Sequence, residues 1–226
     1  MEEETLQLVS KQLPDIRPQQ IKAALGLMDE GNTIPFIARY RKEMTGTLDE
    51  VQLQAIRDEY HRVTTLRERQ ATVINKIKEL GKLTPALEKQ INGATELQEV
   101  EDLYLPYKQK RQTKAQQARE HGLAPLANWL LSYPDDDLSA KAQEFINDDV
   151  PDAESALTGA HEILAEAISE MATVRSWLRN YTAQHGQLET SVKRNGEEKD
   201  ELGTYKQYYE FTSLVQKLNS YQILDF

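Results

Sequence analysis

The sequence contains no cysteine in its 226 residues. This absence excludes disulfides, zinc sites built from thiolates and cysteine nucleophiles, and it fits a reducing compartment. No apolar run approaches the roughly 18 residues that a membrane-spanning helix needs. The acidic start, Met-Glu-Glu-Glu-Thr, has no apolar segment behind it and is unlike a signal peptide. These absences predict a soluble, cytoplasmic chain that makes no membrane contact.

The short motifs that mark common active sites are also missing. There is no glycine-rich nucleotide loop, no His-Glu-x-x-His pair and no Gly-x-Ser-x-Gly elbow for a serine nucleophile. The histidines are scattered along the chain, at His61, His121, His161 and His185. Three consecutive acids, Asp135 to Asp137, are an alternative site for a divalent cation, but nothing around them has the spacing of a calcium loop. We predict no enzymatic activity, no cofactor and no metal site.

The charge balance restricts the kind of partner. The formal net charge is −10 and the pI is about 5.0, which argues against binding nucleic acid over the whole surface. A local basic patch remains possible. The length corresponds to one large domain or two small ones. Charged residues make up 28% and hydrophobic residues 39%, a composition typical of long exposed helices.

One segment has the opposite charge to the chain as a whole. Between Lys108 and Arg119 there are five cations and no acid. They are Lys108, Lys110, Arg111, Lys114 and Arg119. Cations at this density can contact phosphates and release counterions. The alternative is a solvated helix face whose cations cap helix ends or pair with the eight acids between Asp135 and Glu154.

A second basic group lies in the segment Pro35–Gly46, with the sequence PFIARYRKEMTG. The helical spacing predicts that its apolar side chains face a core. These are Phe36, Ile37, Tyr40 and Met44. The cations then remain in solvent as candidate phosphate contacts, namely Arg39, Arg41 and Lys42. A capping box from Thr47 to Glu50 predicts the start of the next helix.

The apolar periodicity predicts a mainly α-helical fold. Three helices joined by short turns between residues 18 and 60 form a helix-turn-helix-like part, although any small three-helix bundle has the same pattern. Residues 48–80 contain no proline or glycine and predict one long helix. An alanine-rich repeat over residues 152–184 predicts a second long helix that packs against the first. Residues 188–192 and 205–211 predict a small β-hairpin around Asn195-Gly196.

These elements suggest three regions along the chain. Residues 1–66 form the N-terminal helical, helix-turn-helix-like part. Residues 67–185 form a central helical region, and residues 186–226 form an extended, hairpin-containing segment.

Three stretches of the sequence resemble the Tex family of bacterial transcription accessory proteins, relatives of a eukaryotic transcription elongation factor. The first runs from Asp29 to Gly46 and continues with Leu48-Asp49. The second is Glu101–Lys108 together with Lys114-Ala115, and the third is Ala118–Ala127. The first two are long, unusual and in the family's order, so the match is specific. It extends over about residues 10–211.

The resemblance implies a mostly helical N-terminal region with a helix-turn-helix-like part and long central helices. In full-length members it implies a following resolvase-like domain, helix-hairpin-helix elements and a C-terminal OB-type RNA-binding domain, all of which this chain lacks. It also implies nucleic-acid binding that is largely sequence-independent and depends strongly on that last domain. The chain would then be an N-terminal fragment or a shortened homologue.

A few positions depart from the family pattern. Gln109 and Gln112 replace a usual proline and a usual basic residue, and Tyr221-Gln222 replaces a usual His-Arg pair. Two functional hypotheses follow. In the first, a non-enzymatic helical module contacts RNA or DNA weakly through the two basic groups, beside the transcription machinery. In the second, the module is a structural scaffold for protein interaction and binds no nucleic acid itself.

Overall fold

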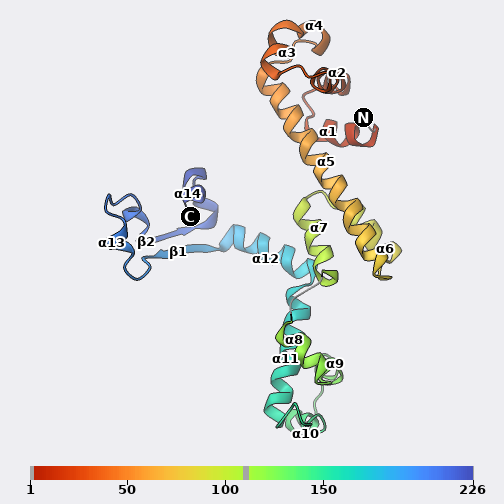
Figure 1. Cartoon of the computed structure of the whole chain (residues 1–226), viewed down its shortest axis with the longest axis vertical. Coiled ribbons are helices and arrows are strands. Elements are labelled where there is room, and N and C mark those ends of the chain that lie inside the picture. The colour runs from red at the N-terminus through yellow and green to blue at the C-terminus, as the bar shows by residue number, and fades with distance from the viewer. Residues whose placement is uncertain (1–2, 109–111, 226) are drawn as a thin grey trace. The chain divides into compact units, whose positions relative to one another are not determined.

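The computed structural model describes residues 3–108 and 112–225. These residues form fourteen α-helices, three short 3-10 helices and one two-stranded antiparallel sheet (Figure 1). The predicted mainly α fold with a hairpin near the C-terminus is therefore confirmed. The chain divides into two compact units, residues 1–104 and 105–226, and each is described by itself.

In the first unit the helices are α1 (Glu3–Gln12), α2 (Pro18–Asp29), α3 (Ile34–Tyr40), α4 (Lys42–Thr45), α5 (Glu50–Glu79), α6 (Pro85–Gly93) and α7 (Leu97–Tyr104). In the second unit the elements are η1 (Leu105–Tyr107), α8 (Lys114–Glu120), α9 (Ala124–Leu130), α10 (Leu138–Gln143), α11 (Ala153–Ser169), α12 (Ala172–His185), β1 (Gln187–Ser191), α13 (Gly196–Lys199), η2 (Lys206–Tyr208), β2 (Glu210–Leu214), η3 (Val215–Lys217) and α14 (Ser220–Asp225).

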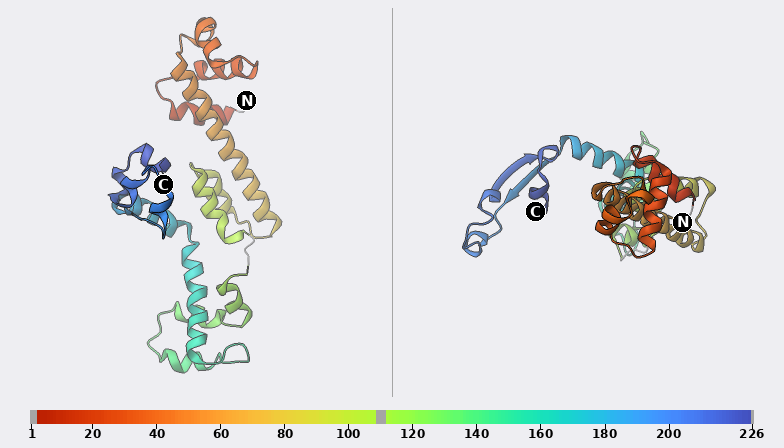
Figure 2. Two further views of the ribbon diagram at one scale, coloured as in Figure 1. Left: turned by 60° about the vertical axis from the view of Figure 1, so that its left-hand side comes forward. Right: turned by 90° about the horizontal axis from the view of Figure 1, so that it is seen from above.

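The predicted long helix over residues 48–80 is confirmed as α5, a continuous helix of 30 residues (Figure 2). Helices α1, α2 and α3 pack on its first half and share one core with it. Fully buried aliphatic side chains form the centre of that core, namely Val9, Ile21, Ile37, Leu53 and Ile56. The helix-turn-helix character of α2 to α5 stays a prediction.

The capping box that starts α5 lies two residues later than predicted. The Asp49 carboxylate accepts a hydrogen bond from the backbone N–H of Gln52 (2.8 Å), and the Gln52 side-chain oxygen accepts one from the Asp49 N–H (3.1 Å). Thr47 has a φ of 69° and does not cap the helix. The prediction chose the wrong pair because Thr-x-x-Glu and Asp-x-x-Gln overlap in the sequence.

The second half of α5 carries α6 and α7, and one buried polar residue fixes α6. Gln70 is 2% exposed and donates hydrogen bonds to the carbonyl oxygens of Ile91 (2.8 Å) and Ala94 (3.0 Å). These oxygens lie at the C-terminal end of α6, where carbonyls have no partner within the helix. Gln70, which interrupts the apolar repeat of α5, is therefore a side-chain cap for the neighbouring helix.

In the second unit, α8, α9 and α10 pack on α11 through small side chains. Ala115 and Ala118 of α8 are buried, and so are Ala156 and Ala160 of α11. Gly159 of α11 lies where an added Cβ would stand 2.3 Å from a methyl carbon of Leu123. A larger side chain there would push α11 away from Leu123.

The second long helix predicted over residues 152–184 is two helices, because α11 ends at Ser169 and α12 begins at Ala172. Met171 between them has an extended ψ of 117°. At the C-terminal end of α11, the Ser169 carbonyl oxygen accepts a hydrogen bond from the Arg175 guanidinium (3.3 Å). Neither proline nor glycine marks this break. The predicted packing of the second long helix against α5 would join the two units and stays a prediction.

The predicted hairpin forms, with β1 antiparallel to β2 and Leu188 opposite Ser213 (Figure 2). The second strand lies later than predicted, because residues 206–208 form the 3-10 helix η2. Asn195 adopts the left-handed conformation at the predicted turn. The Asp200 carboxylate closes the connection by accepting hydrogen bonds from the Thr204 N–H (2.8 Å) and the Tyr209 hydroxyl (3.0 Å).

Candidate nucleic-acid interface

The first predicted basic group lies on α3 and α4, which we call the tip (residues 34–46). Proline in the first turn of α3 suits the helix start, because its missing N–H would have no partner there. Ile37 and Ala38 are buried and attach the tip to the core. Arg39, Arg41 and Lys42 are all exposed, as predicted.

The prediction was wrong for three of the four apolar side chains of the tip. Ile37 faces the core, but Phe36, Tyr40 and Met44 are 37%, 68% and 58% exposed. The predicted pattern assumed one continuous helix. The helix breaks at Arg41, whose φ and ψ are −127° and 23°, so Met44 no longer shares a face with Ile37. Phe36 and Tyr40 lie on α3 itself, one turn apart, on a stripe beside the buried Ile37-Ala38 face. The tip therefore presents aromatic rings to solvent beside its cations.

Ion pairing within the described part of the chain does not involve the three cations of the tip. Among the residues that the structure describes, no carboxylate lies within ion-pair distance of Arg39, Arg41 or Lys42. The Arg41 guanidinium lies 5.5 Å from the centre of the Phe36 ring, a cation–π distance. Glu43 is the one acid within the tip, and it is exposed as well. Three cations against one carboxylate leave a local positive charge.

The tip is held in place by α2. The Gln20 side-chain amide donates hydrogen bonds to the carbonyl oxygens of Thr45 and Gly46, both at 3.0 Å. The Gln20 oxygen in turn accepts one from the Arg17 guanidinium (3.0 Å). Gly46 has a φ of 65°, and a Cβ there would lie 2.9 Å from the Gln20 amide nitrogen. Glycine is therefore required at the end of α4, and the tip is ordered before any ligand binds.

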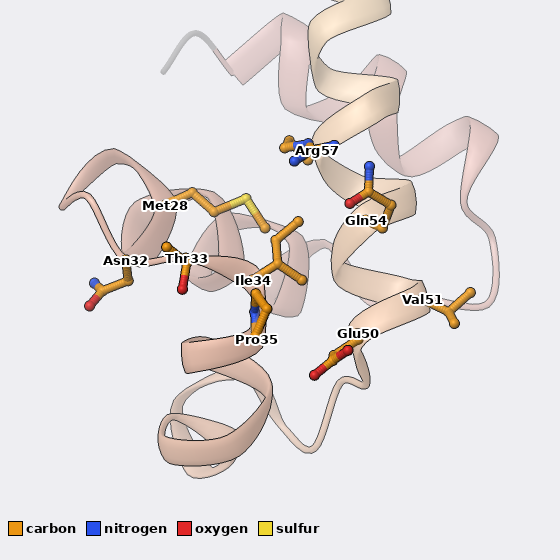
Figure 3. Close-up of a pocket in the computed structure, with 9 residues that line it drawn as sticks. All are labelled: Met28, Asn32, Thr33, Ile34, Pro35, Glu50, Val51, Gln54 and Arg57. Carbon is orange, nitrogen blue, oxygen red and sulfur yellow. The ribbon is translucent and has the colours of Figure 1, made fainter.

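A groove of about 700 Å³ lies beside the tip, between the end of α2, the start of α3 and the start of α5 (Figure 3). Met28, Ile34 and Pro35 line one side, and Val51 lies at the edge of the other. The polar side chains along it belong to Asn32, Thr33, Glu50, Gln54 and Arg57. The groove offers apolar contact and holds no cluster of titratable groups suited to catalysis.

The second predicted basic group is largely used within its own unit. Arg119 forms an ion pair with Glu166 of α11 (2.6 Å), and Lys114 lies 3.6 Å from Glu162 of the same helix. The prediction that these cations pair with the acids of residues 135–154 was therefore wrong for both. The correct partners are more than forty residues away in the sequence, on the helix that packs against α8.

The other members of the second group are less defined. Lys108 is exposed, and no ion pair joins it to a described carboxylate. Lys110 and Arg111 lie outside the described residues. The structure thus leaves Arg39, Arg41 and Lys42 exposed on the tip and without an ion pair to any described carboxylate, and it ties Lys114 and Arg119 to α11.

Further observations limit the functions that the described residues can have. Within residues 3–108 and 112–225, no group of three His, Asp or Glu side chains is placed to hold a metal ion. Asp137 caps α10 by accepting a hydrogen bond from the Ser139 N–H (2.9 Å). None of the described helices combines the length and apolar character that crossing a membrane requires.

Sequence reasoning missed Phe36 and Tyr40 as candidate contact residues because it assigned both to the core. The signal was present, since aromatic residues alternate with cations from Phe36 to Lys42. The sequence analysis also did not propose the aromatic residues of α12 as contact residues. There the ring centres of Trp177 and Tyr181 lie 5.3 Å apart, and those of Tyr181 and His185 lie 4.8 Å apart.

The fold and the tip define a mainly helical module with one exposed basic and aromatic surface. A model of the Tex-like protein N-terminal domain matches residues 3–78, and a Tex central region-like model matches residues 133–226. The chain belongs to the Tex family.

Individual relatives agree with this assignment. Protein YdcI of Bacillus subtilis is 40% identical over an alignment 227 residues long, gaps included. That alignment covers 98% of this chain and 31% of the relative. The transcriptional accessory protein Tex of Neisseria gonorrhoeae is 43% identical over 205 residues, 91% of this chain and 27% of the relative. The human S1 RNA-binding domain-containing protein 1 is 28% identical over 218 residues, 93% of this chain and 22% of the relative. The chain thus spans less than a third of the length of each.

Proposed function

We propose that this chain is a non-enzymatic helical module of a Tex-like transcription accessory protein, and that its tip contacts the phosphates of RNA or DNA. One observation carries the proposal. Arg39, Arg41 and Lys42 are exposed on an ordered tip and have no carboxylate partner among the described residues. Cations in this state can approach phosphates without first breaking an ion pair.

Phosphate contact of this kind carries little sequence information, because the backbone is the same at every position. The proposal therefore is binding without strong sequence specificity. The names of two relatives support a role near nucleic acid, one as a transcriptional accessory protein and one as an S1 RNA-binding domain-containing protein. Contact with the transcription machinery is part of the same proposal.

The number of cations sets the expected strength. If each of the three neutralises one phosphate, the slope of log affinity against log salt is about −2.1 on single strands and about −2.7 on duplex DNA. Raising the salt from 50 to 200 mM then weakens binding by about 20- to 40-fold. This is a modest, strongly salt-dependent contact.

The test is a fluorescence-anisotropy titration of the whole chain against labelled single-stranded RNA and duplex DNA over that salt range. The variant Arg39→Gln/Arg41→Gln/Lys42→Gln should bind weakly with a slope near zero. A matched control, Lys108→Gln/Lys110→Gln/Arg111→Gln, removes three cations from the other basic group and has the same net charge. Because the proposal places the phosphate contact at the tip, this variant should keep more of the wild-type affinity and salt slope than the tip variant does.

A third variant tests the sign of the effect. Glu43→Gln removes the one carboxylate of the tip, so it should tighten binding to phosphate. Equal binding by the wild type and the tip variant, or loss of binding only in the control, would refute the proposed role of the tip. Absence of binding at 50 mM salt would favour the alternative, a scaffold for protein interaction.

A further inference from the structure

The aromatic side chains of the tip are placed for more than phosphate contact. The rings of Phe36 and Tyr40 lie one helical turn apart on α3, with centres 5.2 Å apart and planes tilted by 46°. Tyr40 is 68% exposed, and no described residue accepts a hydrogen bond from its hydroxyl. Phe36 is 37% exposed. The Phe36 ring is therefore partly packed, whereas the Tyr40 ring is mostly open to solvent.

One cation of the tip lies over one of these rings, and the other two are close to them in the sequence. Arg41 lies over the Phe36 ring at 5.5 Å, and Arg39 and Lys42 are the direct sequence neighbours of the Tyr40–Arg41 pair. Aromatic rings beside phosphate-binding cations are the arrangement with which proteins bind single-stranded nucleic acid. The rings stack on unpaired bases while the cations follow the backbone. In a duplex the faces of the bases are covered by their neighbours, so an exposed ring has nothing to stack on.

We propose that Tyr40, supported by Phe36, is a stacking site for one unpaired base, and that this site makes the tip prefer single strands over duplex. The inference rests on the proposed function, because the cations must first bring the strand to the tip. It adds the class of ligand and a residue that selects it. The contribution of the ring is separable from that of the cations, since a base stacks and a phosphate does not.

The exposed aromatic set of α12 is a useful contrast. Trp177 and Tyr181 are 62% and 51% exposed and stacked with their planes only 22° apart. Arg175 beside them already donates a hydrogen bond to the Ser169 carbonyl. Arg179 of the same helix also has an interaction partner. Both described arginines of α12 are therefore already engaged, and we expect the tip to be the stacking site.

The experiment compares two labelled single strands of equal length, oligo-dT and an abasic strand with the same number of phosphates. The wild type should bind oligo-dT about 5- to 160-fold more tightly than the abasic strand, because stacking on an aromatic side chain is lost when the base is absent. Tyr40→Leu keeps the apolar bulk and removes the ring. It should lower oligo-dT affinity to the abasic level, with an unchanged salt slope and unchanged abasic binding.

Two further variants distinguish the loss of base stacking from a change in the fold of the tip. Tyr40→Phe retains the ring and should retain the preference for oligo-dT. Tyr40→Trp should also retain it, and in a Trp177→Phe background its fluorescence should be quenched by oligo-dT and unaffected by the abasic strand. The remaining tryptophan, Trp129, packs against the core of the second unit and lies outside the tip.

The outcomes separate the two proposals. Equal affinity of the wild type for both strands, with a steep salt slope, would overturn the stacking site and leave the phosphate contact intact. A Tyr40→Leu variant that keeps the full preference would also overturn it, and quenching of Trp177 in the wild type would assign stacking to α12 instead. If the wild type binds neither strand, the proposed function fails and the stacking site fails with it.

Discussion

The ion pair between Arg119 and Glu166 leads to a prediction that separates a structural cation from a ligand-binding one. Arg119 Nη1 lies 2.6 Å from a Glu166 oxygen, and the Thr113 hydroxyl donates to the other oxygen at 2.9 Å. The Glu166 side chain is 13% exposed and that of Arg119 is 36% exposed. Arg119→Met keeps the aliphatic stem and removes the charge, so it leaves a largely buried carboxylate with one strong partner fewer.

The loss of stability follows from these contacts. A fully exposed ion pair contributes about 0.2–1 kcal/mol, and a hydrogen bond to a charged group contributes about 1.5–3 kcal/mol. Because Arg119 is 36% exposed, water screens part of the interaction. We therefore expect Arg119→Met to lower the free energy of unfolding of the second unit by about 1–2 kcal/mol.

Tryptophan fluorescence is a selective assay for this effect, because both tryptophans of the chain, Trp129 and Trp177, belong to the second unit. Trp129 packs against the core that α8 and α11 share. The urea midpoint reported by its fluorescence should fall by roughly 0.5–1 M in Arg119→Met. Lys114→Met is the matched control, since the Lys114 side chain is 80% exposed and its midpoint shift should be within error.

Nucleic-acid affinity should respond in the opposite way to stability in these variants. Arg119→Met should bind oligo-dT with the affinity and salt slope of the wild type, whereas Arg41→Gln should weaken binding and leave the unfolding midpoint unchanged. An Arg119→Met chain with an unaltered midpoint and a shallower salt slope would refute the reasoning, because it would show that this cation serves phosphate rather than Glu166.

Two further predictions concern the scaffold. Gln70→Leu should lower the free energy of unfolding by about 2–4 kcal/mol, because it leaves the carbonyl oxygens of Ile91 and Ala94 without their hydrogen-bond donor. Urea unfolding followed by circular dichroism measures this loss, and a loss below about 1 kcal/mol would contradict the capping role. Burial alone would raise the pKa of Asp200, but hydrogen bonds from the backbone N–H groups of residues 205 and 204 and from Tyr209 outweigh it and lower that pKa. Its ionised form therefore stabilises the connection between the hairpin strands above about pH 4, and this contribution is lost as the pH falls through the lowered value. Amide NMR shifts of residues 204 and 205 should report that transition in the wild type and none in Asp200→Asn.

Local sequence signals predicted a helix well where caps and breakers within the helix itself determine its ends. The helix predicted over residues 48–80 extends from Glu50 to Glu79, because its ends carry strong caps and its interior has neither proline nor glycine. The break between α11 and α12 has no such signal. It lies at Glu170-Met171, whose side chains are ordinary helix formers, so the apolar repeat continues across a change of direction that only tertiary contacts determine.

The candidate site was predicted in part, for a similar reason. Exposure of Arg39, Arg41 and Lys42 follows from their charge, since burying an unpaired cation is costly. Exposure of Tyr40 does not follow from its type, because aromatic residues occur both in cores and on binding surfaces. Whether a cation is paired is still harder to predict. Arg119 and Glu166 meet only because two helices pack together, and counting charges along the chain cannot show this.

The small number of cations on the tip limits how tightly the tip can bind nucleic acid. Proteins that hold nucleic acid firmly make about 6–10 phosphate contacts, whereas the tip offers three cations and carries one opposing carboxylate. Some other cations of the first unit are used internally, as in the pairs of Arg62 with Glu59 and Arg69 with Glu101. The tip alone therefore binds weakly, but it is ordered by Gln20 before a strand arrives and so costs little to immobilise. A weak, preformed contact gains most when a second nucleic-acid-binding element is tethered to it, because the tether raises the local concentration of the strand. We therefore propose that the tip positions an unpaired strand and that a second, tethered nucleic-acid-binding element would retain it.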